Sequence, residues 1–327
     1  MTIMACRDSH RNITLSAFHS ILTSETLLSV AGPDAATFLQ GQLTCDVSEV
    51  DAVTARLGAY CNPQGRMVCD FLLSQAGDQR YLLRLRAANA AHTRDTLGKY
   101  IVFSKAELAQ VDDTARIVAV WGDDARDTIA ESLGGAPETP LGCWHGEGAS
   151  VVQLPGETPA FECYLEGADA AGRADALVAA TEAGSQDTWE VIQHSAGLGR
   201  VEAANADEFI PQMLNYDLTG HVSFTKGCYT GQEVVARMHY RGKPKRRMYR
   251  ATLAAGEAVA GDALHASSSA QSVGNVAGAA ALPDGGQSLL VVATADGVEA
   301  GLHLDSAEGQ QLQIEPLPYS LTGDDDA

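Results

Sequence analysis

The charge of the sequence changes abruptly near residue 245, and this change limits how the chain can be divided into domains. Residues 221–250 hold eight of the 22 Lys and Arg residues and a single acid, whereas residues 251–327 hold eleven acids and no Lys or Arg. A composition shift of this kind indicates a domain boundary. We therefore expect one region at residues 1–242 and a separate domain at residues 243–327.

The acidic tail has the pattern of a small all-β domain. Apolar runs separated by Gly, Asp and Pro turns predict short strands. These strands are expected at residues 248–253, 272–277, 289–294 and 311–317. A tail of this length with this pattern favours a small β-barrel.

The first two-thirds of the chain alternates extended and helical patterns. Strands at 55–61 and 66–73 flank a predicted hairpin turn, in which Pro63 sets φ and Gly65 closes the turn. Strand–helix pairs follow. The strands are expected at 81–86, 116–121 and 161–165, and the helices at 87–99, 123–133 and 168–183. Hairpins mixed with strand–helix units predict an α+β fold rather than a doubly wound sheet.

Composition excludes several classes of protein. With 45% hydrophobic and 20% charged residues, the 327-residue chain is not disordered, collagen-like or a disulfide scaffold. No run approaches the ~20 apolar residues of a membrane helix, and the N-terminus lacks the apolar segment of a secretory signal. Seven scattered cysteines without a Cys-x-x-Cys pair are typical of reduced thiols rather than of a zinc site. We expect a cytoplasmic monomer with no metal site and no membrane contact.

The strongest candidate for chemistry is the segment 226–237, which reads Lys-Gly-Cys-Tyr-Thr-Gly-Gln-Glu-Val-Val-Ala-Arg. Thr230 and Glu233 form a capping-box pattern before an apolar run, so a helix is predicted at 231–240. Cys228 then lies just before a helix N-terminus. The partial positive charge there, together with the Lys226 ammonium, favours a thiolate.

Cys228 has two interpretations. It could be a nucleophile or a metal ligand, and the neighbouring Gly227 and Gly231 would let the backbone approach a ligand closely. It could equally be a small buried filler, because cysteine is among the most buried residue types. The residues alone leave both open.

Three further side chains are candidates, each with a structural alternative. Trp189, in a helix predicted at 187–196, could stack on a flat heterocycle or pack in the core. Glu202 follows two glycines that end this helix, and it could accept two hydrogen bonds from an amidine-like edge such as a pterin offers. Asp70 in the apolar hairpin strand could be a catalytic carboxylate, although an exposed acid on the alternate face of the strand is the expectation.

The basic run from Tyr240 to Arg250 also has two interpretations. It could follow the phosphates of RNA, with Tyr240 and Tyr249 available for stacking. It could instead be a solvated linker that the acidic tail partly neutralises. The net charge of -20 favours the linker.

The segment from Lys226 to Glu233, with Arg237 beyond it, resembles the signature of the YgfZ family, folate-binding proteins related to the aminomethyltransferase of glycine cleavage. An eight-residue match with an internal cysteine is specific. The resemblance runs along nearly the whole chain. Further similar blocks lie at residues 38–46, 100–105, 203–205, 209–212 and 314–321.

The resemblance implies an aminomethyltransferase-like fold of three small lobes around a central channel, with a folate-binding region that is split in sequence and a C-terminal β-barrel. It implies that the protein binds tetrahydrofolate or a one-carbon derivative. It also implies a role in assembling or repairing iron–sulfur clusters in client enzymes, including enzymes that thiolate tRNA.

The resemblance also implies roles for single residues. Trp189 and Glu202 would lie at the pterin site, and Cys228 would be the reactive thiol near the reactive end of the folate. Lys226 would help to organise the loop around Cys228. Tyr229 and Arg237 would contact the cofactor, Arg237 through the folate carboxylates.

Asp70 keeps a second function open. Many relatives lack the acid that true aminomethyltransferases carry in the hairpin strand, yet Asp70 stands in about that place. If it faces the folate, it could move a proton in an aminomethyl or methyl transfer. Whether the protein is an enzyme is therefore undecided from the sequence. A module that docks tRNA through residues 240–250 is a third hypothesis.

Overall fold

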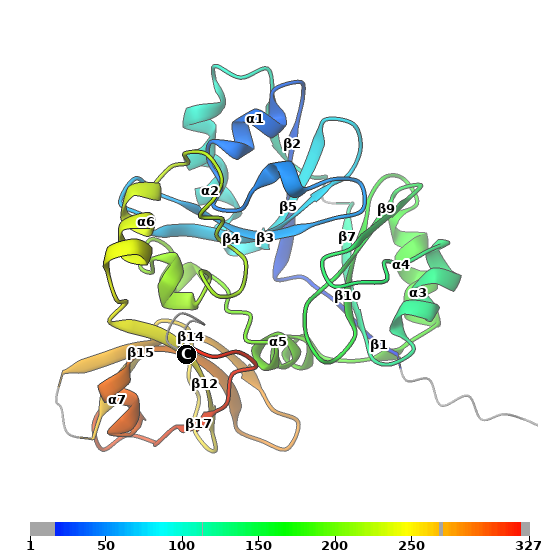
Figure 1. Ribbon diagram of the computed structural model, residues 1–327. Coiled ribbons are helices and arrows are strands. Elements are labelled where there is room, and N and C mark those ends of the chain that lie inside the picture. The colour runs from blue at the N-terminus through cyan, green and yellow to red at the C-terminus, as the bar shows by residue number, and fades with distance from the viewer. Residues whose placement is uncertain (1–16, 113, 268–270, 322–327) are drawn as a thin grey trace, which may run out of the picture.

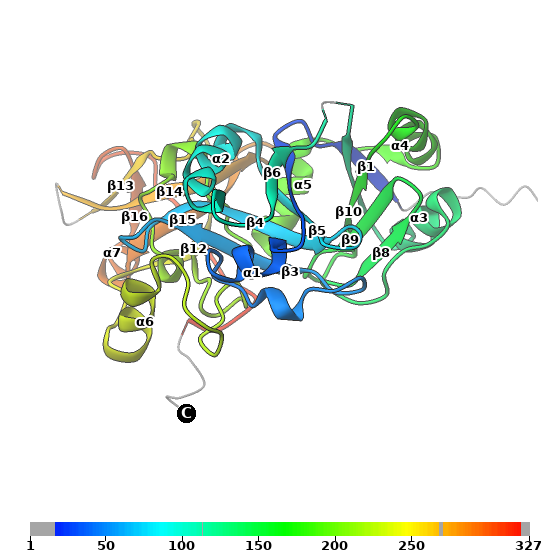
Figure 2. The ribbon, with the colours of Figure 1, turned by 90° about the horizontal axis from the view of Figure 1, so that it is seen from above.

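Three β-sheets, each with its own helices, make up the protein (Figure 1). The computed structural model describes residues 17–112, 114–267 and 271–321. Seen from above, the sheets lie in a row with the first sheet in the middle (Figure 2). The chain thus forms three lobes that meet at the first sheet.

The first sheet is antiparallel, with five strands in the order β3-β4-β5-β2-β6. Its strands are β2 (Glu25–Ala31), β3 (Arg56–Cys61), β4 (Met67–Gln75), β5 (Arg80–Arg86) and β6 (Glu107–Gln110). The helices α1 (Ala35–Gln40) and α2 (Ala87–Ile101) cover one face. Phe38 of α1 and Leu97 of α2 pack there against Phe71 and Leu83 of the sheet.

The other face of the first sheet carries the charged residues that shape the centre of the protein. Side chains alternate between the two faces of a strand, so Asp70 shares a face with Leu72, and Arg84 shares one with Leu82. Leu72 and Leu82 belong to the core that lies between the first and second sheets. This alternation directs Asp70 and Arg84 into the interior, where both are buried.

The second sheet packs opposite this charged face. Its six strands run in the order β11-β1-β7-β10-β9-β8. They are β1 (Phe18–Ile21), β7 (Arg116–Trp121), β8 (Cys143–Gly146), β9 (Ala149–Gln153), β10 (Ala160–Leu165) and β11 (Glu182–Ala183). The helices α3 (Ala125–Leu133) and α4 (Ala170–Ala179) cover its outer face, and Trp121 and Tyr164 point towards the first sheet.

The third sheet is the C-terminal lobe, with the order β16-β13-β14-β15-β12-β17. Its strands are β12 (Arg246–Leu253), β13 (Ala263–Ala266), β14 (Ser272–Ala281), β15 (Gln287–Thr294), β16 (Leu302–Leu304) and β17 (Gln313–Glu315), and α7 (Ala295–Glu299) follows β15. A bridge between His303 and Gln311, with a 2.8 Å bond from Leu312 N to Leu302 O, joins β16 to the segment that leads into β17. The sheet therefore curls towards a small barrel.

Two helices and the loops around them connect these lobes. The helix α5 (Gln186–Ser195) packs on β14 and β15 of the third sheet and also contacts β1 of the second. The 3₁₀ turns η2 (Ala203–Asn205) and η3 (Pro211–Leu214) follow it. The helix α6 (Gln232–Arg241) then leads into β12. The other 3₁₀ turn, η1 (Val47–Glu49), lies in the first lobe.

The α+β class and most predicted elements agree with the structure. The strand predicted at 116–121 is β7, and the hairpin of 55–73 is β3 and β4. The helix predicted at 168–183 was too long, because α4 ends at Ala179 and the chain then pairs with β1 as β11. Among the described residues, no helix is both long and apolar enough to cross a membrane. A domain boundary near residue 243 stays a prediction, although the third sheet begins at Arg246.

The loop before α6 fits tightly against the β3–β4 hairpin. Gly231 has φ +84°, a conformation that L side chains rarely adopt, and a Cβ built there would lie 2.5 Å from the carbonyl oxygen of Asn62. In the hairpin, a Cβ on Gly65 would lie 2.7 Å from the Cβ of Val234. Each of the two segments thus occupies space that a side chain on the glycine of the other segment would fill.

We predict that Gly231→Ala lowers the free energy of unfolding by about 1–3 kcal/mol, because it adds both backbone strain and a clash with the hairpin. Urea denaturation measures the change. Gly227→Ala is the matched control, since a Cβ built there would meet no atom within 4 Å among the described residues beyond its chain neighbours. Equal effects of the two substitutions would contradict the interlocked packing.

Candidate functional site

A buried network of ion pairs lies where the first and second sheets face each other. The Nε of Arg200 is 2.5 Å from Oδ2 of Asp70, and its Nη1 is 3.0 Å from Oε1 of Glu25. Arg84 extends the network to the second sheet, because its Nε is 2.7 Å from Oε2 of Glu162. These five side chains are all buried, so each charge depends on its neighbours for stabilisation.

Glu25 shows how strongly the network controls charge. Burial alone would raise its pKa, but the nearby guanidinium groups of Arg200, Arg86 and Arg84 outweigh this effect and lower the pKa to about 2. The carboxylate of Glu25 therefore stays ionised throughout the neutral pH range.

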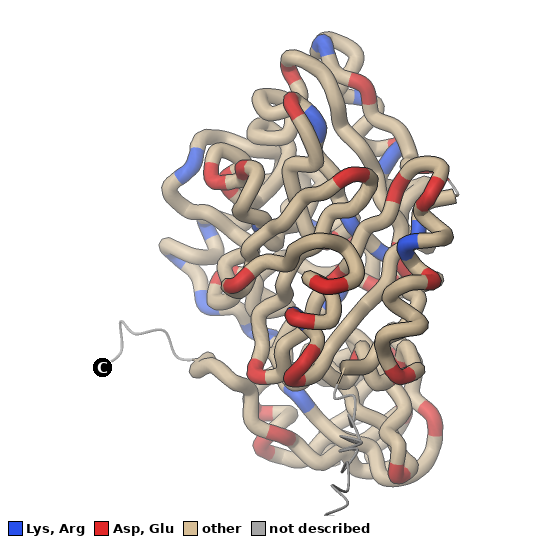
Figure 3. The backbone as a smooth tube through the Cα atoms, turned by 90° about the vertical axis from the view of Figure 1, so that its right-hand side faces the viewer, with Lys and Arg blue, Asp and Glu red and all other residues tan. Residues whose placement is uncertain are grey.

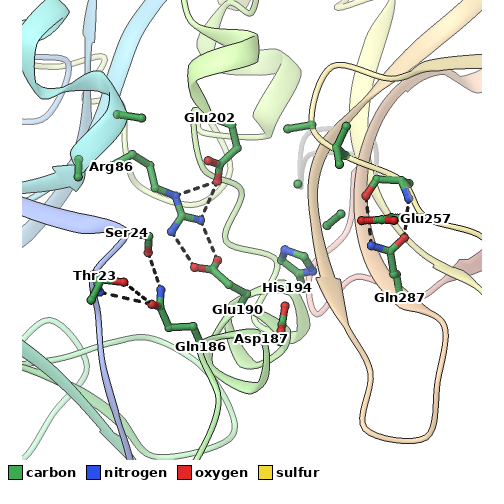
Figure 4. A pocket seen from close by; sticks show the side chains of 17 residues that line it. Thr23, Ser24, Arg86, Gln186, Asp187, Glu190, His194, Glu202, Glu257 and Gln287 are labelled. Carbon is green, nitrogen blue, oxygen red and sulfur yellow. Dashed lines mark hydrogen bonds and ion pairs between the residues drawn. The ribbon is translucent and has the colours of Figure 1, made fainter.

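Arg86 carries the network outward to an open pocket. Its Nη1 is 2.7 Å from Oε1 of Glu25 inside the protein and 2.7 Å from Oε1 of Glu190 on α5. Its Nη2 is 2.8 Å from Oε2 of Glu190 and 2.7 Å from Oε1 of Glu202. One guanidinium thus holds three carboxylates, two of which line the pocket (Figure 4).

The pocket has a volume of about 640 Å³ and lies between the start of α2, the helix α5 and the third sheet. Figure 4 shows Glu190 and Glu202 converging on Arg86, with Glu257 and Gln287 on the opposite wall. Its size suits a small organic ligand. The other lining residues are Thr23, Ser24, Ala87, Ala88, Gln186, Asp187, His194, Ala258, Val259, Ala260, Gly278 and Ala279.

Of the two pocket-lining acids that Arg86 holds, Glu202 has more free hydrogen-bonding capacity. Both Glu190 oxygens accept from Arg86, whereas Glu202 uses only Oε1. Within the part of the chain that the structure describes, Oε2 of Glu202 has no hydrogen-bond partner. Burial raises the pKa of Glu202, and the charges of Arg86 and Arg200 oppose that rise.

His194 lies on the same wall of the pocket, one helical turn after Glu190. Its Nδ1 is 3.1 Å from the Ser288 hydroxyl of β15. Burial lowers the pKa of His194 to about 4, so the imidazole is neutral at neutral pH. This histidine is thus a polar but uncharged part of the lining.

The two residues predicted at the pterin site, Glu202 and Trp189, differ in their access to the pocket. Glu202 lines the pocket. Trp189, in contrast, is 1% exposed and packs against Trp121, with ring centroids 5.9 Å apart. This position is the one that the core interpretation predicts. The indole Nε1 of Trp189 is buried, and it has no hydrogen-bond partner among the residues that the structure describes.

The expectation that Asp70 is exposed was wrong. Asp70 is 3% exposed, and its two oxygens accept hydrogen bonds from Arg200 Nε and, at 2.7 Å, from the backbone N–H of Val201. The error arose because both faces of β4 are covered, one by helices and the other by the second sheet. An acid on the alternate face of such a strand has no access to solvent.

The residues predicted from the 226–237 motif do not line this pocket. Lys226 is buried, and its Nζ donates to the carbonyl oxygens of Leu43 and Cys45, both at 2.7 Å. Burial lowers the pKa of Lys226 to about 8. This lysine ties the loop to the first lobe and also lies over the ring of Tyr229, 5.4 Å from its centroid.

Cys228 is exposed, and among the cysteines of the described residues it is the only one that is. Arg237 is also exposed, on the first turns of α6. Neither residue lines the pocket that contains Glu202. The exposed side chains of the motif loop are therefore not part of the lining of this pocket.

The predicted capping box is absent at the start of α6. Gly231 is the N-cap, with no side-chain cap, and the Thr230 hydroxyl donates instead to Gln42 at 3.0 Å. The helix itself is present. Its N-terminus is shaped by the fit of Gly231 against the hairpin, which a local sequence pattern does not encode.

Sequence reasoning missed the network around Arg200. Glu25, Arg84, Arg86, Glu162 and Glu190 were not singled out. The sequence did hold a signal, since Arg84 stands between two leucines of β5 and Glu162 is the one charged residue of β10. Such residues are buried only when they are paired.

Comparisons with known proteins place the fold among the aminomethyltransferases. The family model described as "GCVT N-terminal domain" matches residues 6–137. The crystal structure of glycine cleavage system aminomethyltransferase T from Bartonella henselae superposes with a TM-score of 0.73 over 94% of this chain and 87% of that one, at 16% identity. The protein therefore has the three-lobed, aminomethyltransferase-like fold that the sequence resemblance predicted.

Curated relatives define the family more closely. The "tRNA-modifying protein YgfZ" of Klebsiella pneumoniae (strain 342) is 32% identical over 302 residues, covering 90% of each chain. The protein of the same name from Escherichia coli O7:K1 (strain IAI39 / ExPEC) is 34% identical over 303 residues, covering 90% of this chain and 91% of its own. This chain belongs to the YgfZ family.

We predict that Arg200→Ala lowers the free energy of unfolding by about 3–5 kcal/mol, because it leaves Asp70 and Glu25 buried without their main partner. Chemical denaturation at neutral pH measures this loss. Arg56→Ala is the control, since Arg56 pairs with Glu49 at the surface and such pairs contribute at most about 1 kcal/mol. A loss for Arg200→Ala no larger than that of the control would show that the network is not stabilised as described.

Proposed function

We propose that this protein binds tetrahydrofolate, or a one-carbon derivative of it, in the pocket beside Arg86 and that it acts in tRNA modification. The observation that carries the proposal is the unused Oε2 of Glu202 at the wall of a pocket of about 640 Å³. A pterin ring presents adjacent N–H donors, which a carboxylate accepts well. Membership in the YgfZ family and the name that its relatives carry support the link to tRNA.

Within this proposal, Glu202 and Arg86 recognise the pterin. Arg86 keeps the Glu202 carboxylate in place through Oε1, and Oε2 remains available to the ligand. His194 is neutral and offers a further polar contact on the same wall. Trp189 anchors α5 to the second sheet by packing on Trp121. We therefore assign Trp189 an indirect role, in which it positions the helix that lines the site.

We predict that Glu202→Gln weakens the binding of tetrahydrofolate about 10-fold to 100-fold, because hydrogen bonds to a charged group contribute roughly 1.5–3 kcal/mol. Isothermal titration calorimetry on the full chain measures the affinity. Glu257→Gln is the matched control, because Glu257 lines the same pocket but is exposed and lies on the opposite wall. Equal affinities of the two variants, or no binding by the wild type, would contradict the placement of the pterin.

We further propose that Cys228 is the reactive thiol, and that it acts in the assembly or repair of iron–sulfur clusters in client enzymes, including tRNA-thiolating enzymes. Its exposure supports this role. Burial raises the pKa of Cys45, Cys69 and Cys143 to about 12, so these thiols are inaccessible and protonated at neutral pH. In the same proposal, Lys226 and Tyr229 fix the loop, and Arg237 meets the folate carboxylates or a client.

We predict that Cys228→Ala leaves the affinity for tetrahydrofolate unchanged and lowers the activity of iron–sulfur client enzymes in cells that depend on this protein. Cys228 does not line the pocket, so its loss removes the thiol without changing the ligand contacts. Thr225→Ala serves as the control, since Thr225 is exposed in the same loop. Full client activity with Cys228→Ala would remove the thiol from the mechanism.

The geometry gives no support to a one-carbon transfer that uses Asp70 as the acid. Both Asp70 oxygens are engaged, by Arg200 and by the Val201 N–H, and the carboxylate is buried. We therefore assign Asp70 to the network that holds the lobes together.

A further inference from the structure

A second hollow lies on the other side of the η2 turn and concentrates positive charge. Its volume is about 500 Å³, and its lining includes Arg66, Lys245 and Arg246. The remaining lining residues are Ala204, Asn205, Glu208, Phe209, Met213, Gly261 and Asn275. Glu208 is its one acidic residue, and that side chain is exposed.

The three cations of this hollow have no ion-pair partner in residues 17–112, 114–267 and 271–321. The next residue along the chain, Arg247, does form an ion pair, and its Nη1 is 2.6 Å from Oδ1 of Asp217. Acidic positions are spread over the side of the molecule drawn in Figure 3, and the whole chain carries a net charge of -20. Unneutralised cations gathered in one hollow of so acidic a protein indicate an anionic ligand.

The walls of the hollow are fixed by hydrogen bonds. The Asn62 side-chain oxygen accepts from the backbone N–H of Arg66 at 3.1 Å, which holds the hairpin tip. Asn205 donates to the carbonyl oxygens of Val276 and Ala277 at 3.3 and 3.2 Å, and this joins η2 to β14. The hollow is thus formed by the first lobe, the connecting segment and the third sheet together.

An aromatic cluster lies shortly before Lys245 in the chain, and it favours one kind of anion. Phe224 and His239 are stacked, with ring centroids 3.6 Å apart, and Tyr240 packs edge-on against both and is 67% exposed. Tyr240 precedes Lys245 by five residues, so their Cα atoms are at most about 19 Å apart. An exposed ring within a few residues of cations that lack an ion-pair partner is a combination that suits a single nucleic-acid strand.

We propose that the hollow of Arg66, Lys245 and Arg246 binds phosphate groups of an RNA strand, and that Tyr240 stacks on one of its bases. Guanidinium groups match the geometry of phosphate oxygens, and Lys245 adds a point charge. The acidic γ-glutamyl tail of a folate would also be attracted by the cations, but it has no ring to place on Tyr240. The inference rests on the proposed role in tRNA modification and names the surface that contacts the RNA.

The test compares the full-length wild type with the double variant Lys245→Ala/Arg246→Ala in binding to fluorescein-labelled unfractionated tRNA. Fluorescence anisotropy is recorded at several salt concentrations. Each lost phosphate contact lowers the slope of log affinity against log salt by roughly 0.7–0.9, so the double variant should lose roughly 1.5 in slope and bind about tenfold more weakly at about 0.1 M salt. Tyr240→Ala should weaken binding with little change in slope, because stacking releases no counterions.

The controls separate this inference from the proposed folate site. Arg126→Ala removes an exposed cation from α3 on the second lobe and should change neither affinity nor slope. Tetrahydrofolate affinity of the double variant should match that of the wild type. An unchanged slope, no binding of tRNA by the wild type, or loss of affinity for pentaglutamyl tetrahydrofolate in place of tRNA would overturn the inference. Those results would not bear on the proposed pterin site. Conversely, failure of tetrahydrofolate to bind would contradict the proposed pterin site and would not bear on the RNA-binding surface.

Discussion

The rest of the structure depends on the ion pairs of Arg200 with Asp70 and Glu25. Arg200 lies in the segment after α5, Asp70 on β4 and Glu25 on β2, so this one guanidinium joins three parts of the chain that are distant in sequence. Arg84 continues the contact to Glu162 on the second sheet. A buried charge without a partner costs several kcal/mol, so the two sheets can face each other only in the arrangement that pairs these groups. The network therefore specifies how the lobes meet as well as stabilising them.

The sequence predicted those features that depend on local patterns. The hairpin, the strand at 116–121 and four strands of the acidic tail follow from residue alternation and turn residues, and the structure contains them, whereas β13 and β16 were not predicted. The motif around Cys228 identified the family, and the relatives confirm it. Glu202 was selected for its acid chemistry, and it lines the main pocket.

The remaining features depend on contacts between distant segments. Asp70 was expected at the surface because the pattern of one strand does not reveal that a second sheet covers its alternate face. Thr230 was expected to cap α6, but its hydroxyl bonds to Gln42 from a loop nearly two hundred residues earlier. Local propensity cannot anticipate such partners. The same reason explains why a pocket formed by α2, α5 and the third sheet could not be outlined from the sequence.

Arg86 belongs to the interior and to the pocket at once. Its Nη1 contacts Glu25 among the buried charges, and the same guanidinium holds Glu190 and Glu202 at the wall. A ligand that binds Glu202 thus changes the ion pairs of Arg86, and Arg86 is the residue that anchors α5 to the first sheet. Ligand binding in the pocket and the stability of the junction between the lobes are therefore coupled. If a more stable junction strengthens ligand binding by a given free energy, ligand binding stabilises the junction by the same amount.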